Sequence, residues 1–494
     1  MPAHGGLGVS ALPTGTGCAA WRGALAGSRA LTSASVPFGS EIGFRLGSLR
    51  RMSLPERLTT VLTAEVAEAQ RRWRTPGLSV GVARDGELAW SHHAGSGRLE
   101  PPTAATDDTQ VMIGSITKTF TALLVMQLRD EGRLDLEDPL GTWLPDSRHA
   151  GLTVRRLLSH TSGLQREPVG HLWETLDAPD VERLLTELED AKQVLPPHLA
   201  FHYSNLGFAL LGQVVERLDG RPWEAALRER LLTPLGMSRT SLTPAEDHAL
   251  GYQVDPFAGT ATREPELALR AMAPLGGLWS SVADMARYAA FLTEPDPAVL
   301  RPETLDEMCR PLVMVDPDSW RTGYGLGYEL VRSGDRVLVG HRGAMPGFLS
   351  GLRVSRPHGV GVFVVATTTA GAESGPLATR LLDRVLDALP RVRPAWTPEQ
   401  PRPDLHELLG SWWSEGEELV LEVREGELWM RVAAGAPVDD TRFAREDEAT
   451  FRAIAGRERG ERLELVRDAD GNLAKLYFAT YAVTRRPTAF ADLT

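Results

Sequence analysis

The stretch IGSITKTF, residues 113–120, opens a run of mostly apolar residues that continues to Leu128. The apolar side chains cover nearly every face of a helix, so this segment is predicted to run through the core of a domain. Ser115 and Lys118 are three residues apart, and on a helix their side chains share one face and can meet. The predicted helix ends at Gly132, a residue type that commonly follows a helix C-terminus.

This serine–lysine pair indicates nucleophilic catalysis. A serine hydroxyl is a weak nucleophile until a neighbouring base removes its proton, and a neutral lysine can be that base. Burial in an apolar core favours the neutral form of Lys118. Ser115 at the helix N-terminus would also lie beside free backbone N–H groups, which favour a developing oxyanion.

The choice of lysine at position 118 is informative in this chain. Of the 53 basic residues only three are lysines, at positions 118, 192 and 475, and the rest are arginines. Arginine does not lose its proton in proteins and cannot act as a base. A lysine retained three residues after a serine therefore supports a role in proton transfer.

Composition limits the classes of function. The 494 residues are 42% hydrophobic and 24% charged, which fits a globular protein of two or three domains. The net charge of −12 offers no basic field for nucleic acid or an anionic membrane, and no apolar run approaches ~18 residues without a charge. The two cysteines and the histidine spacing give no metal-site pattern, so neither a metal nor another cofactor is predicted.

Residues 1–51 differ from the rest of the chain. They are rich in Gly, Ala and Ser and contain no acidic residue before Glu41. They also lack the positive start and compact apolar core of a secretory signal. We interpret them as a disordered extension, with Met52 as the natural start, and we expect a cytoplasmic protein.

Residues 52–390 show the order of an α+β domain, an antiparallel sheet covered by helices. Asp85-Gly86 between two alternating segments is a strong hairpin signal. Residues 337–347, VLVGHRGAMPG, are interpreted as an apolar strand, a break, and a Gly-rich stretch where a ligand backbone could come close. Helices are expected at 58–72, 153–158, 208–218 and 377–389, and further strands at 78–83, 87–92, 349–354 and 360–366.

Three short segments, in order, resemble the active-site motifs of class C β-lactamases and their relatives, the penicillin-binding proteins, D-amino-acid peptidases and esterases. They are SITK (115–118), YSN (203–205) and HRG (341–343), supported by LLSHTSGL (157–164), PLGM (234–237) and GGLWSS (276–281). The resemblance covers about residues 55–390. It implies the β-lactamase/DD-peptidase-like fold, in which helices flank an antiparallel sheet and an all-helical subdomain is added.

The resemblance also implies roles for individual residues. Ser115 would form an acyl-enzyme, while Lys118 and Tyr203 would share the acid–base work; which of the two takes the serine proton stays open. Asn205 would orient Lys118 and the substrate. The backbone N–H groups of Ser115 and Ala344 would form an oxyanion hole.

The HRG segment differs from that of many β-lactamases, which carry a lysine at the position of His341. A lysine there suits the carboxylate of a β-lactam, whereas a histidine is mostly neutral near pH 7. His341, followed by Gly343, therefore resembles the peptidase and esterase branches more than the antibiotic-hydrolysing one.

Beyond the proline-rich segment 391–403, which is predicted to be a stiff linker, residues 404–494 show short alternating strands. This pattern predicts a small antiparallel β domain that resembles the lipocalin-like barrel of many family members. Arg485 and Arg486 near its end are candidates to bind a substrate carboxylate. Strands are expected at 419–423, 427–432, 462–467 and 475–483, with turns at Glu425-Gly426 and Asp470-Gly471.

The leading hypothesis is a serine acyl-enzyme hydrolase that acts on a small peptide, amide or ester, including substrates with D-amino acids. One alternative is a thioesterase or acyltransferase of the penicillin-binding-protein type that cyclises nonribosomal peptides. An alternative of another class is a sensor that binds acyl ligands without turnover. The expected partner is a small-molecule or peptide acyl substrate, with neither nucleic acid nor membrane, and the sequence leaves the oligomeric state open.

Overall fold

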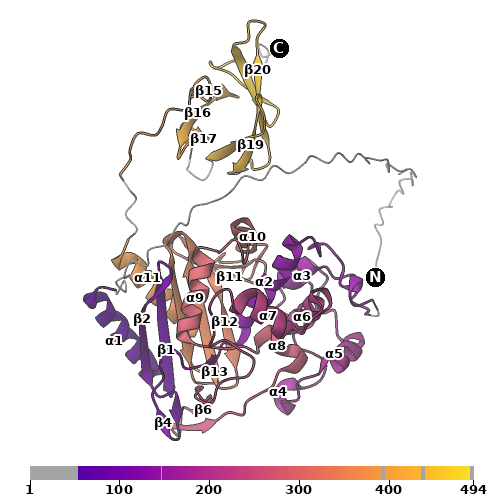
Figure 1. Ribbon diagram of the computed structural model, residues 1–494, viewed down its shortest axis with the longest axis vertical. Helices are drawn as coiled ribbons and strands as arrows, with labels where there is room; N and C mark the ends of the chain where they lie inside the picture. Colours follow the sequence, from indigo (N-terminus) through magenta and orange to yellow (C-terminus); the bar gives the residue numbers. More distant parts are fainter. Residues whose placement is uncertain (1–53, 146, 391–394, 436–439, 490–494) are drawn as a thin grey trace, which may run out of the picture. The chain divides into compact units, whose positions relative to one another are not determined.

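The computed structural model describes residues 54–145, 147–390, 395–435 and 440–489 (Figure 1). The chain divides into two compact units, Met1–Ala388 and Leu389–Thr494, and each unit is described by itself. The predicted extension 1–51 lies outside the described residues. Within the described ranges, no helix combines the length and the hydropathy needed to cross a bilayer.

An eight-stranded antiparallel sheet forms the centre of the first unit, in the order β2-β1-β14-β13-β12-β11-β10-β9. The strands from the start of the unit pair with those from its end, since β1 lies beside β14. Asp85 and Gly86 both have positive φ, as the tight turn between β1 and β2 requires. The bounds are β1 Gly77–Arg84, β2 Glu87–Gly95, β9 Val313–Met314, β10 Thr322–Tyr324, β11 Glu329–Ser333, β12 Arg336–Met345, β13 Phe348–Ser355 and β14 Val360–Ala366.

Helices cover both faces of this sheet (Figure 1). α1 (Glu56–Trp73) and α11 (Ser374–Ala388) pack together on one face, and α9 (Val282–Thr293) packs on the other against β1 and β14. This arrangement confirms the predicted α+β class. Its apolar strands are buried because both faces are covered.

A helical subdomain surrounds α2 (Thr117–Asp130), whose residues from Thr117 to Leu128 are all buried. α6 (Asn205–Asp219), α7 (Trp223–Leu227) and α8 (Ala273–Gly276) pack against α2. The prediction of a core helix is therefore confirmed. The shorter helices are α3 Val154–Leu158, α4 Leu172–Thr175, α5 Val181–Glu187 and α10 Pro302–Met308.

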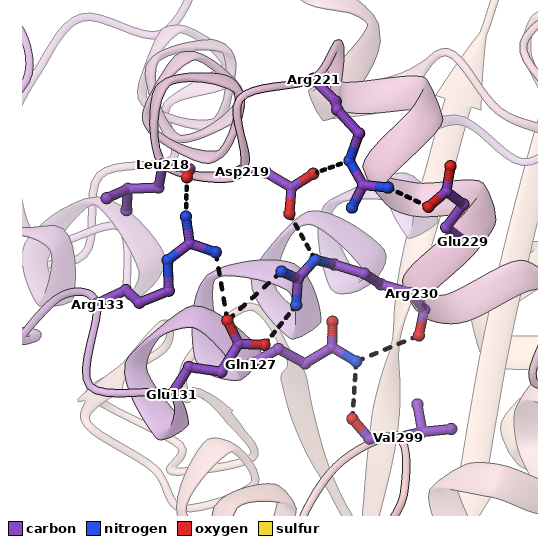
Figure 2. Close-up of polar contacts among 9 residues, drawn as sticks. All are labelled: Gln127, Glu131, Arg133, Leu218, Asp219, Arg221, Glu229, Arg230 and Val299. Carbon is purple, nitrogen blue, oxygen red and sulfur yellow. Dashed lines mark hydrogen bonds and ion pairs between the residues drawn. The ribbon is translucent and has the colours of Figure 1, made fainter.

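A polar network ties the far end of α2 to the far end of α6 (Figure 2). The Asp219 side chain, only 1% exposed, accepts hydrogen bonds from Arg230 Nε at 2.7 Å and Arg221 Nε at 2.6 Å. Arg230 also donates to Glu131 Oε1 at 2.5 Å, just beyond α2. Gln127 Nε2 donates to the Val299 carbonyl at 2.7 Å. The network fixes two helices whose opposite ends carry Lys118 and Asn205.

Two local predictions were wrong. The GHRGAMPG stretch does not interrupt a strand, because β12 continues to Met345 and His341 pairs with Leu352 of β13. A glycine is needed at position 343 inside this strand because the backbone of Ile113 comes close to it. A Cβ on Gly343 would lie 2.0 Å from the Ile113 carbonyl oxygen. The helix predicted to open at Ser115 begins instead at Thr117, after a 3₁₀ turn of residues Gly114–Ile116.

The second unit is a meander of eight antiparallel strands that is nearly closed into a barrel. Trp413 on the first strand and Thr484 after the last exchange backbone hydrogen bonds of 2.8 and 2.9 Å. The predicted strand 475–483 is in fact two strands with a turn at Ala479-Thr480. The bounds are β15 Gly410–Ser414, β16 Glu417–Arg424, β17 Glu427–Val432, β18 Thr441–Arg445, β19 Thr450–Ala455, β20 Arg462–Arg467, β21 Leu473–Phe478 and β22 Tyr481–Val483.

Candidate active site

Lys118 and Ser115 are in hydrogen-bond contact, with 3.0 Å between Lys118 Nζ and Ser115 Oγ. The same Nζ lies 2.8 Å from Asn205 Oδ1 and 2.8 Å from the Leu275 carbonyl oxygen of α8. Lys118 is 0% exposed. Burial lowers the pKa of Lys118 well below its usual value, Glu167 opposes this effect, and Arg166 adds to it. The amine can therefore lose its proton more readily than an exposed lysine.

Gly114 brings Ser115 against strand β12. It has φ +53°, and a Cβ there would lie 2.7 Å from the Ala344 backbone nitrogen. A side chain at this position would push the Ser115 turn away from β12, so the close approach depends on glycine. Ser350 Oγ strengthens the contact by donating to the Ile113 carbonyl at 2.8 Å. The backbone of residues 114–115 and that of Ala344 consequently lie side by side.

Tyr203 is half-buried just before α6, and its ring centre lies 4.3 Å from that of His160, which follows α3. The Ser115 hydroxyl is close enough to the Tyr203 phenol to act on its pKa. Lys118 Nζ is 4.9 Å from the centre of the Tyr203 ring. Burial raises the pKa of Tyr203, and the nearby Ser115 hydroxyl only partly offsets this effect. The phenol is therefore protonated near pH 7.

Asn205 is the first residue of α6, which Ser204 caps by accepting the Gly207 N–H at 3.0 Å. A polar cap in front of an apolar helix explains why the helix starts here. The Asn205 side chain joins two groups: Oδ1 accepts from Lys118, and Nδ2 donates to Glu167 Oε1 at 2.7 Å. Sequence reasoning missed Glu167, whose position just after the LLSHTSGL segment was the available signal.

His341 is 4% exposed on β12. Its Nδ1 lies 2.6 Å from the Arg342 carbonyl oxygen, and its Nε2 lies 3.1 Å from the Tyr324 hydroxyl. Since a carbonyl only accepts, Nδ1 carries the proton and Nε2 accepts from Tyr324. Burial lowers the pKa of His341 to about 4, although Glu329 acts in the opposite direction. The ring is therefore neutral near pH 7.

Next to His341, Arg342 places a permanent positive charge at the site. Its guanidinium, 60% exposed, pairs with the buried Glu329, with 2.7 Å between Nη2 and Oε1. Arg353 pairs with the other oxygen of Glu329, also at 2.7 Å. Burial alone would raise the pKa of Glu329, but Arg353, His341 and Arg342 hold it at about 2. Arg342, Arg353 and Glu329 together carry a net positive charge. The sequence analysis considered only the residue at position 341 and did not include this charge.

These segments meet at a cleft of about 590 Å³. Its volume is within the range of small-ligand sites, about 300–1,000 Å³. The residues that line it include Ser115, Arg166, Tyr203, His341, Gly343 and Ala344. Across the described ranges, no group of three or more His, Cys, Asp or Glu side chains is arranged to hold a metal ion.

The two arginines singled out in the second unit differ in their contacts. Arg485 donates to the carbonyls of Leu409 at 3.0 Å and Ser411 at 3.1 Å, and its guanidinium carbon lies 3.9 Å from the centre of the Trp412 ring. Its guanidinium is thus engaged in holding the barrel's own backbone. Arg486 is exposed, and a substrate role for it stays a prediction.

The comparisons with known proteins agree with this geometry. The Beta-lactamase family model matches residues 62–387, and a domain of unknown function (DUF7586) matches residues 401–485. The chain therefore belongs to the β-lactamase family and is a serine hydrolase of the class C and penicillin-binding-protein type. This membership confirms the resemblance stated from the three motifs.

Two relatives and one solved structure are similar to this chain over nearly their whole length. The chain is 34% identical to penicillin-binding protein 4 of Amycolatopsis lactamdurans over 371 residues, which is 69% of this chain and 94% of the relative. It is 30% identical to esterase EstB of Burkholderia gladioli over 385 residues, 68% of this chain and 96% of the relative. A D-amino acid amidase from Ochrobactrum anthropi SV3, complexed with L-phenylalanine amide, superimposes with a TM-score of 0.58 at 26% identity, covering 67% of this chain and 98% of that one.

Proposed function

We propose that this chain is a serine acyl-enzyme hydrolase of small peptides, amides or esters, including substrates with D-amino acids. The observation that carries the proposal is the 3.0 Å contact between Ser115 Oγ and the fully buried Lys118 Nζ, at a cleft of small-ligand size. The relatives named as an esterase, a penicillin-binding protein and a D-amino acid amidase support this substrate range.

In the first half-reaction, Ser115 Oγ attacks the substrate carbonyl carbon while its proton passes to the neutral Lys118 amine. Lys118 is the better first acceptor, because burial lowers its pKa but raises that of Tyr203. The oxyanion faces the backbone N–H groups of Ser115 and Ala344. As the tetrahedral intermediate collapses, the bond to the leaving amine or alcohol breaks, and Tyr203 donates a proton to it and regains one from Lys118.

In the second half-reaction, water attacks the acyl carbonyl and the same groups move protons in the reverse sense. One proton of the water returns to Ser115 Oγ by way of Lys118, and the acid product leaves. Asn205 orients Lys118, and His341, neutral near pH 7, lines the cleft without adding a charge, while the Arg342 charge attracts anionic groups.

Ser79 offers a rival nucleophile that must be tested. His93 Nδ1 lies 2.9 Å from Ser79 Oγ, and His93 Nε2 lies 3.0 Å from Asp107 Oδ1. Ser79 is in the middle of β1, between β2 and β14, where strand pairing occupies the backbone. An oxyanion there would find no free N–H pair, so we assign this chain of hydrogen bonds a structural role.

A fluorophosphonate probe followed by peptide mass spectrometry tests the proposal. The adduct should map to Ser115, Ser115→Ala should lose both the adduct and turnover of a nitrophenyl ester, and the matched Ser79→Ala should keep both. Near-normal turnover by Ser115→Ala would refute the assignment. Absence of steady nitrophenol release from the unmodified chain would instead favour the acyl-ligand sensor.

A peptidyl thioester separates hydrolysis from transfer. Hydrolysis gives a linear acid, while a cyclase gives a product lighter by one water. We expect the linear acid, and a predominantly cyclic product would support the thioesterase alternative.

A further inference from the structure

The short segment 165–167, between α3 and α4, lies across the start of α6. The Gln165 carbonyl accepts from Ser204 Oγ at 2.7 Å. The Arg166 carbonyl accepts from the backbone N–H of Asn205 at 2.6 Å and of Leu206 at 3.1 Å. N–H groups in the first turn of a helix have no acceptor within the helix. Segment 165–167 supplies that acceptor and fixes the position of Asn205.

Glu167 extends this support to the Asn205 side chain. The chain of contacts is Glu167 Oε1 to Asn205 Nδ2 at 2.7 Å, Asn205 Oδ1 to Lys118 Nζ at 2.8 Å, and Lys118 Nζ to Ser115 Oγ at 3.0 Å. A carboxylate only accepts hydrogen bonds, so it must face the amide nitrogen of Asn205. The amide oxygen is therefore directed at Lys118.

The orientation of this amide has a chemical consequence. With Oδ1 facing Lys118, the amide accepts an N–H of the amine and leaves the nitrogen lone pair for the serine proton. A reversed amide would present N–H groups to Lys118, donate to that lone pair and compete with Ser115. Glu167 prevents the reversal from a position outside the residues that line the cleft.

We propose that Glu167 is a positioning residue for acylation: its carboxylate locks the Asn205 amide toward Lys118 and, against the neighbouring Arg166, balances the charge at the Lys118 amine. The inference rests on the proposed function, because it takes Lys118 as the base. It concerns two residues that the three motifs do not contain.

The groups that face Lys118 come from several elements. Segment 165–167 contributes Glu167, which raises the pKa of Lys118, and Arg166, which lowers it. Tyr203 precedes α6, His160 follows α3, and His341 lies on β12. Burial raises the pKa of Tyr203 and lowers the pKa of both histidines, so these three groups are neutral near pH 7.

Glu167 and Arg166 carry opposite charges, so replacing each in turn should shift the pH dependence of activity in opposite directions. A merely structural role for Glu167 would not produce these opposite shifts. Glu167→Gln removes the negative charge but keeps an oxygen that accepts from Asn205. The pKa of Lys118 should fall further, and the acid limb of kcat/KM against pH should move to lower pH. Arg166→Gln removes the positive charge and should move the same limb to higher pH.

The experiment measures kcat and KM for a nitrophenyl ester across pH in the full chain. Glu167→Gln should keep its plateau kcat within about threefold of the unmodified chain. Glu167→Leu removes the acceptor and should lower kcat by about 10- to 100-fold with little change in KM, because it strands a buried N–H without touching the cleft. Glu174→Gln, an exposed residue on α4, is the matched control and should give an unchanged profile.

The inference is overturned if the acid limbs of Glu167→Gln and Arg166→Gln both coincide with that of the unmodified chain. It is also overturned if both variants move the acid limb in the same direction. Fluorophosphonate labelling distinguishes this failure from failure of the proposed function. If the probe labels Ser115 and the chain turns over the ester, but the acid limbs of the two variants do not separate, only the role of Glu167 is refuted. If Ser115 never labels, the proposed function fails as well. Glu167→Gln is nearly isosteric, so the test does not depend on Glu167→Leu folding.

Discussion

Replacing Lys118 by arginine puts a permanently charged guanidinium in place of the neutral amine that we propose as the base. An arginine does not release its proton, so it cannot accept one from Ser115. A positioned general base contributes about 10²–10⁴ in rate. Lys118 is also fully buried, with Nζ in contact with Ser115, Asn205 and Leu275, and the larger guanidinium would overpack this space at a cost of about 1–3 kcal/mol. From the loss of the base we expect kcat/KM to fall by about 10²–10⁴.

Stopped-flow release of nitrophenol measures the acylation step directly. Lys118→Met has a side chain of similar length without a base, and it should lose as much acylation rate as Lys118→Arg while remaining folded by circular dichroism. Lys192→Arg, at an exposed lysine, is the matched control and should be unaffected. A Lys118→Arg variant that kept more than about a tenth of the acylation rate would refute the base role.

Two further predictions concern stability. Asp219→Ala should lower the free energy of unfolding by about 3 kcal/mol, because it leaves two arginines around a buried site without their shared partner. Glu229→Gln, at the exposed end of the network, should lower it by only about 0–1 kcal/mol. Equal melting temperatures for the two variants would contradict the network of Figure 2. The folded-state pKa of His341, about 4, lies below its ordinary 6.5, so the unfolded chain binds the proton first and stability should fall as pH falls from 6.5 to 4. His341→Gln should remove roughly 2–4 kcal/mol of this pH dependence in urea titrations, and an unchanged slope would show that the ring is not held neutral.

The sequence predicted well what depends on local spacing. Ser115 and Lys118 meet although Ser115 lies in a 3₁₀ turn, because a separation of three residues puts two side chains on one face in either type of helix. Asp85-Gly86 predicted its hairpin because the turn requires positive φ at two positions. Both signals are contained in a few neighbouring residues.

The sequence was less informative about residues whose role depends on tertiary contacts. Tyr203 and Asn205 gave only a weak signal until the family resemblance was added, since a contact between residues 118 and 205 leaves no local pattern. Glu167 and Arg166 lie in a segment without periodicity, and only the approach of α6 gives them a role. The break predicted within residues 337–347 was wrong, because the close approach of the Ile113 backbone, and not a turn, requires a glycine at position 343.

In the second unit, β15, β18 and β19 were missed for a related reason. They are five or six residues long, and polar residues interrupt their apolar alternation, as the arginines do in TRFAR at 441–445. Pairing with neighbouring strands and burial of Trp412 and Phe443 in the barrel core override this weak local signal.

The central claim is that Ser115, activated by Lys118, carries the acyl group during turnover. Its most direct test is mass spectrometry of the protein quenched within the first turnover of a D-aminoacyl ester. The account predicts a mass gain equal to the acyl group, located on the peptide that contains Ser115 and absent from Ser115→Ala. Turnover without any such adduct, or an acyl group mapped to another residue such as Ser79, would contradict it.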